Sequence, residues 1–180
     1  MLPVPFGAFA KHPGAILATG VNRMPFALKL THDEPRLVYL ALVYHLGRPG
    51  SELDRETKMP IEHGLREVKL DLGAHLADES AVIELGEAQY RRLLSAIYGA
   101  VNELRVYHMR EGAESGIARF TETARTLFPE IVADPENALT IAEAMMMLHR
   151  RLERAVSRAS LAAPPEAEQP KRHRWPFGRR

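Results

Sequence analysis

The sequence predicts a mainly helical protein, a bundle of about five helices to which two short β-prone runs can add a two-stranded ribbon. Three observations lead to this fold class. The chain has 180 residues, of which 46% are hydrophobic, and this suits one domain with a substantial core. Apolar residues then recur at steps of four and three, the spacing of one helix face. Finally, Phe26–Leu30 and Ala81–Leu85 are short runs rich in strand-forming residues.

Composition divides the chain into three parts. Residues 1–27 contain four prolines and three glycines without an apolar period, so we expect an irregular N-terminal arm. Residues 28–161 carry the helical periodicity and form the predicted bundle domain. Residues 162–180 contain several prolines and a block of basic residues, which predicts a disordered basic tail.

The first predicted helix is apolar almost all round. Thr31 and Glu34 have the spacing of a capping box, Pro35 suits a first turn, and Gly47 ends the helix. A helix of this kind is a central core element or an oligomer interface. From the second interpretation we predict partner-binding residues, namely Leu37, Leu40, Tyr44 and, from a later helix, Met146.

Four further helices follow from the periodicity. The second is expected from Pro60 to Leu76, and the third carries the repeat of Tyr90, Leu94, Ile97, Val101 and Leu104 and extends to His108. The fourth spans Ile117 to about Pro129, and the fifth runs from Ala138 past Leu152. Seams of this spacing pack helices side by side at shallow angles.

Two segments of the chain resemble each other. Residues 28–46 and 83–101 both run from a β-prone triplet through a turn into an apolar helix, 55 residues apart. One interpretation is a duplicated strand–helix unit whose two strands pair into a ribbon. The other is the ordinary likeness of any two strand–turn–helix segments, because few residues are identical.

A search for catalytic and metal-binding motifs gives little. Dinucleotide-binding, P-loop and nucleophile-elbow fingerprints are absent, and the lack of cysteine excludes disulfides and thiolate chemistry. The pair His149 and Glu153 shares a helix face and is a weak candidate for two metal ligands, although an ordinary side-chain pair explains it as well. His108 continues an apolar seam and is a candidate buried base. No metal and no cofactor are predicted.

The tail combines cations with an aromatic ring. Such a segment can contact phosphates or an anionic membrane weakly, or serve only solubility. The predicted anionic-surface residues are Lys171, Arg172, Arg174, Trp175, Arg179 and Arg180.

Three hypotheses of function remain open. The first is a non-enzymatic interaction or oligomerisation protein that acts through its helix faces, with a second copy or another protein as partner. The second is a ligand-binding or enzymatic bundle with a buried His/Glu pocket, built from His108 or His149 with Glu103, Glu143 or Glu153. The third is a peripheral nucleic-acid or membrane binder that acts through its tail. The lack of a signal peptide and of cysteine favours the cytoplasm.

Overall fold

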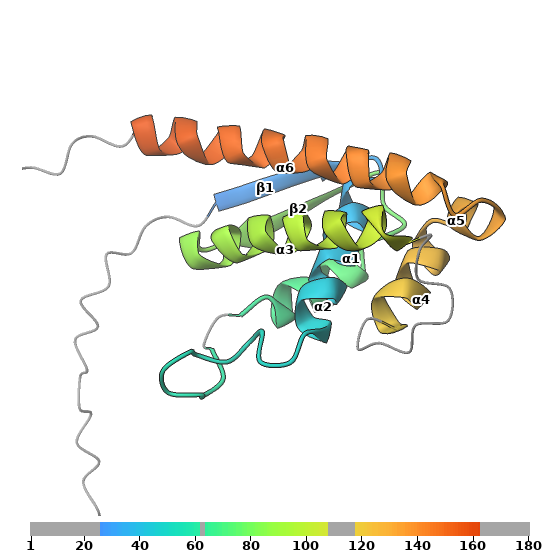
Figure 1. The fold of residues 1–180 in the computed structure, drawn as a ribbon. Helices are drawn as coiled ribbons and strands as arrows, with labels where there is room; N and C mark the ends of the chain where they lie inside the picture. The colour runs from blue at the N-terminus through green and yellow to red at the C-terminus, as the bar shows by residue number, and fades with distance from the viewer. Residues whose placement is uncertain (1–25, 62–63, 108–117, 163–180) are drawn as a thin grey trace, which may run out of the picture.

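A computed structural model describes residues 26–61, 64–107 and 118–162, and it confirms the mainly helical fold with a two-stranded sheet (Figure 1). The predicted N-terminal arm and basic tail lie almost wholly outside these residues. The elements in chain order are β1 (Phe26–Thr31), α1 (Glu34–Gly47), α2 (Arg66–Gly73), β2 (Ser80–Leu85), α3 (Glu87–Arg105), α4 (Ala118–Leu127), α5 (Glu130–Ala133) and α6 (Asn137–Ala162).

The two strands pair antiparallel, as the sequence predicts. Phe26 lies opposite Leu85 and Thr31 opposite Ser80, which extends each expected strand by one residue at most. Buried and exposed side chains alternate along both strands, so one face of the ribbon covers the helices. Leu28 and Ile83, which are register partners, are both buried on that face.

The helix α1 is buried within its own chain. It packs against β1, α2, α3, α4 and α6, so nearly every side of the helix has a neighbour. This arrangement satisfies a helix whose apolar residues point in all directions. Its N-terminal end is held by Glu34, whose Oε2 accepts a hydrogen bond from the Thr31 backbone N–H (2.9 Å) and from Arg151 of α6 (2.7 Å).

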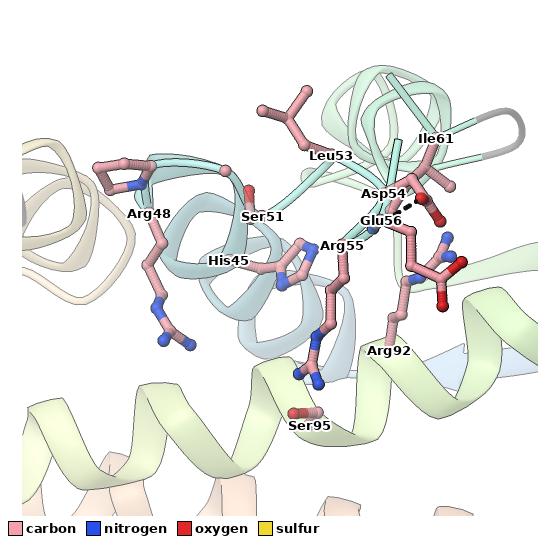
Figure 2. A pocket seen from close by; sticks show the side chains of 12 residues that line it. His45, Arg48, Ser51, Leu53, Asp54, Arg55, Glu56, Ile61, Arg92 and Ser95 are labelled. Carbon is pink, nitrogen blue, oxygen red and sulfur yellow. Dashed lines mark hydrogen bonds between the residues drawn. The ribbon is translucent and has the colours of Figure 1, made fainter. Parts of the chain in front are cut away.

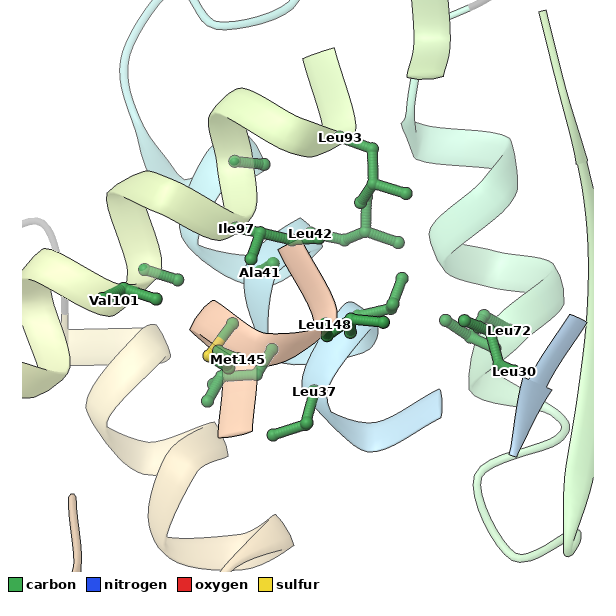
Figure 3. Packing of buried hydrophobic residues seen from close by; sticks show 14 of the residues in the cluster. Leu30, Leu37, Ala41, Leu42, Leu72, Leu93, Ile97, Val101, Met145 and Leu148 are labelled. Carbon is green, nitrogen blue, oxygen red and sulfur yellow. The ribbon is translucent and has the colours of Figure 1, made fainter. Parts of the chain in front are cut away.

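The long helix α6 runs antiparallel to α3, packs along it and also contacts α1 (Figure 1). Figure 3 shows Met145 and Leu148 of α6 among the apolar side chains of α1 and α3. Beside them, the Tyr90 hydroxyl donates a hydrogen bond to the Leu152 carbonyl oxygen (2.9 Å). Burial raises the pKa of Tyr90, so this donor keeps its proton over the whole neutral range.

Two helix boundaries differ from those expected. The second helix begins at Arg66 instead of Pro60, because residues up to Ile61 form a polar connection in which Ile61 N–H bonds the Glu52 carbonyl oxygen (2.8 Å). The third helix ends at Arg105, short of His108. The fourth helix, α4, ends at Leu127, close to Pro129 as expected, and the single turn of α5 follows that proline, which cannot continue a helical hydrogen-bond ladder.

The geometry supports the interpretation of the two similar segments as a duplication. Residues 55 apart make the same hydrogen bond at the start of each helix, from Thr31 N–H to Glu34 Oε2 and from Gly86 N–H to Gln89 Oε1, both at 2.9 Å. Leu28 and Ile83, also 55 apart, are partners in the sheet register. A local twofold axis that relates the two units would pass through that last pair.

A substitution in α1 tests whether this helix is core or interface. Leu40 is fully buried, so Leu40→Ala is expected to lower the free energy of unfolding by about 2–5 kcal/mol. The matched control, Leu70→Ala in α2, removes a side chain that is 71% exposed and should cost less than about 1 kcal/mol. Urea unfolding measures both. A loss that varies with protein concentration would contradict burial within one chain.

Candidate functional site

The connection between α1 and α2 is an ordered polar segment. Gly50 has φ +73°, a left-handed conformation that glycine adopts without strain. On either side of it, Ser51 N–H bonds the Arg48 carbonyl oxygen and Leu53 N–H bonds that of Gly50, both at 3.2 Å. Further on, Leu53 and Pro60 form an antiparallel bridge. The segment therefore folds back on itself as a hairpin-like loop beside the end of α1.

At the tip of this loop, Asp54 holds the turn. Its Oδ1 accepts hydrogen bonds from the backbone N–H groups of Thr57 (2.8 Å) and Glu56 (3.0 Å) and from the Thr57 hydroxyl (3.0 Å). These bonds stabilise the ionised carboxylate, and the pKa of Asp54 is lowered, with the Thr57 N–H as the largest cause. The tip thus keeps its shape as long as Asp54 is charged.

Glu52 ties the base of the loop to two helices. Its Oε1 lies 3.0 Å from Nε2 of His45, in the last turn of α1, and its Oε2 accepts the Leu65 backbone N–H (3.0 Å) at the start of α2. The His45 and Glu52 side chains are each only 14% exposed. Gly64 lies against this carboxylate, and its carbonyl oxygen accepts a hydrogen bond from Gln89 of α3 (3.0 Å). One glutamate therefore fixes the loop against α1 and α2, next to α3.

A cavity of about 570 Å³ lies between this loop, the end of α1 and α3 (Figure 2). This volume falls within the range of small-molecule sites. The polar lining comes from α1, the loop and α3, and the apolar lining from Leu53, Ile61 and Pro49. The polar and charged residues that line it are His45, Arg48, Ser51, Asp54, Arg55, Glu56, Arg92 and Ser95.

The three arginines give the cavity its chemistry. Figure 2 shows Arg48 and Arg55 extending toward α3, and Arg92 extending from α3 toward the loop. Arg48 also lies over the Tyr44 ring, 5.7 Å from its centroid. Among the described residues, no carboxylate lies within ion-pair distance of these three guanidinium groups. They are thus free to bind an anion from solution.

The four predicted partner-binding residues differ in how far they are exposed to solvent. Leu37 and Leu40 are buried inside the chain, which corrects their prediction as surface contacts, because neighbouring elements already cover α1. Tyr44 is half-buried, packs edge-on against Phe120 and covers Gly99. Met146 is half-buried on α6. Only Tyr44 and Met146 keep surface that a partner could reach.

The weak metal candidates form an ordinary helix pair. Nδ1 of His149 lies 3.5 Å from Oε2 of Glu153, and the His149 ring lies 6.2 Å from the ring of Tyr98 on α3. Across the described ranges, no three His, Asp or Glu side chains converge as metal ligands would. Glu143 is exposed on α6, away from the cavity.

Some of the predicted site residues lie outside the described part of the chain. The residues that line the cavity were not predicted as site residues from the sequence. His108 and the tail residues 171–180 lie outside the described residues, so their roles stay predictions. The sequence carries one signal for the His45–Glu52 pair, a histidine in the last turn of an otherwise apolar helix, followed by a polar loop. The contribution of Arg92 depends on the contact between α1 and α3, which local spacing does not reveal.

Comparisons of the chain with protein-family models, with curated proteins and with solved structures give no match. No helix in the described part of the chain has both the length and the apolar character that crossing a membrane requires. The site must therefore be interpreted from its own chemistry.

Gly64 offers a test of the Glu52 contact. A β-carbon at Gly64 would overlap the Glu52 carboxylate, so Gly64→Ala should displace this side chain and cost about 1–3 kcal/mol of unfolding free energy. In a Glu52→Ala background the obstacle is gone, and the same substitution should cost much less. A double-mutant cycle by urea unfolding measures the difference. An equal cost in both backgrounds would show that the contact does not hold the loop.

Proposed function

We propose that this protein binds a small anionic ligand in the cavity between α1, α3 and the loop. The observation that carries the proposal is that Arg48, Arg55 and Arg92, each without a carboxylate partner among the described residues, all line one cavity of ligand size. A guanidinium group without a carboxylate partner can donate charge-assisted hydrogen bonds to an anion from solution. This proposal belongs to the second of the three hypotheses, but the His/Glu pair beside the cavity is His45 and Glu52 instead of the pairs predicted from the sequence.

The remaining lining suits the organic part of such a ligand. Leu53 and Ile61 give apolar surface, whereas Ser51, Ser95 and Glu56 offer hydrogen-bond partners for hydroxyl or amide groups. The cavity is several times larger than a bare inorganic anion needs. We therefore propose a ligand with an anionic group joined to a larger polar body, taken up by a protein of the cytoplasm.

Substitution of one arginine tests the proposal against a close control. Arg92→Gln removes a cation that lines the cavity, while Arg91→Gln removes the adjacent one, which pairs with Glu87 on the outside of α3 (2.5 Å). We expect Arg92→Gln to weaken anion binding about tenfold or more, and Arg91→Gln to change it less than about twofold. Isothermal titration calorimetry with sulfate, pyrophosphate and malonate measures this. Equal effects of both substitutions would point to non-specific attraction.

A second candidate function is protein docking along the edge where α3 meets α6. Tyr98 is 52% exposed on this edge, although its ring contacts His149, and the half-buried side chains of Leu94 and Met146 lie on the same two helices. Exposed aromatic and methionine side chains are enriched at protein interfaces. This keeps the first hypothesis, an interaction protein, but moves its surface from α1 to the α3–α6 edge.

A charged side chain at Tyr98 tests this second candidate. Tyr98→Arg should weaken self-association or partner binding at least tenfold, because it places a charge in the middle of an apolar contact. The control Leu70→Arg alters an even more exposed apolar residue, at 71% exposure on α2, and should have no such effect. Light scattering over a range of concentrations, for the wild-type and both variants, gives the answer. A wild-type chain that stays monomeric throughout would argue against self-association through this edge.

A further inference from the structure

The cavity also indicates which anion it binds and what accompanies binding. Resting on the proposed function above, we propose that the anionic group is a phosphoryl group, and that His45 takes up a proton when this group binds. The two parts have separate grounds. The first follows from the placement of the arginines, and the second from the hydrogen bonding of His45.

The arginines come from three different elements. Arg48 follows α1, Arg55 lies in the loop and Arg92 lies on α3, so two of these side chains extend toward α3 and the third extends from α3 toward the loop (Figure 2). A carboxylate has two oxygens in one plane and is satisfied by a single guanidinium fork. A phosphoryl group has three terminal oxygens arranged in three dimensions and up to two negative charges. It can accept from several forks that do not share a plane.

His45 lines the same cavity, and one of its two ring nitrogens already makes a hydrogen bond. Its Nε2 lies 3.0 Å from Glu52 Oε1, and a carboxylate can only accept, so Nε2 carries the hydrogen. In the neutral imidazole the other nitrogen, Nδ1, is then an acceptor and opposes an anion. In the protonated imidazole both nitrogens donate, one to Glu52 and the other to a ligand. An anion that contacts His45 therefore favours the protonated ring.

The other charged groups around His45 do not share this behaviour. Within the described residues, the charged groups that line the cavity with His45 are Arg48, Asp54, Arg55, Glu56 and Arg92, and Glu52 is in direct contact with the imidazole. Between about pH 6 and about pH 8, guanidinium groups and carboxylates ordinarily keep their charge, whereas imidazole does not. For a ligand that does not itself titrate, a change of affinity within that range points to a histidine, and its loss in His45→Gln would assign it to His45.

Sulfate is the probe for the experiment, since it is a tetrahedral dianion that does not titrate over this range. Calorimetric titrations of the full chain are made near pH 6 and near pH 8 at constant ionic strength, in buffers of different ionisation enthalpy. We expect sulfate to bind about tenfold more tightly at the lower pH, with uptake of up to about one proton per site. Malonate, a dicarboxylate, should bind at least several-fold more weakly than sulfate.

Substitution of His45 distinguishes the uptake of a proton from the binding of the anion. His45→Gln keeps an amide donor for Glu52 and loses the titrating ring, so sulfate should still bind with a pH dependence below about twofold. Arg92→Gln should weaken binding at both pH values while the pH dependence remains. Thermal unfolding checks that both variants are folded, and the proton count on the wild-type chain needs no variant.

The possible failures are distinct. No binding of sulfate, pyrophosphate or malonate to the wild-type chain at either pH would overturn the proposed function itself. Binding without proton uptake, or a pH dependence that survives in His45→Gln, would overturn the role of His45 alone. Malonate binding as tight as sulfate binding would overturn the assignment of a phosphoryl group and leave the anion site standing.

Discussion

The burial of α1 is the constraint on which the rest of this structure depends. A helix that is apolar almost all round destabilises the fold wherever its surface stays exposed to water. Each of its sides therefore needs a neighbouring element. The ribbon, α2, α3, α4 and α6 all pack on it. At its C-terminal end the helix becomes more open, because there Tyr44 and His45 are half-buried and Arg48 is exposed. The polar lining of the cavity therefore gathers where the apolar helix ends.

That end is closed by a loop and not by another helix, which explains why a cavity forms there. Helices pack closely because their side chains interdigitate, and they leave little space between them. A polar loop gives no such interdigitation, and here it is fixed at only a few points, chiefly through the two carboxylate oxygens of Glu52. Between those points the loop stands away from α3 and leaves room for a ligand. The same contacts that order the loop therefore also define the wall of the site.

Much of the fold follows from the sequence, because periodic patterns report local structure. The steps of four and three along α3 and α6 place their buried faces correctly, and the alternation in both β runs gives the ribbon. Helix ends were less predictable: Ile61 fits a helical period and yet pairs with Glu52 in the loop. The site escaped prediction for a related reason. Arg48, Arg55 and Arg92 lie in three elements, and only the tertiary packing of α1 on α3 brings them to one cavity.

The likeness of the two strand–helix segments allows equivalent positions of α1 and α3 to be compared. With an offset of 55 residues, Arg92 and Ser95 of α3 occupy the positions that Leu37 and Leu40 occupy in α1. In α1 these positions are buried on all sides, whereas in α3 they line the cavity. The two helices cannot both be surrounded, since a chain of this size has one core and one of the pair must lie nearer its surface. Polar residues are tolerated on the more exposed helix, and there they form one wall of the proposed site.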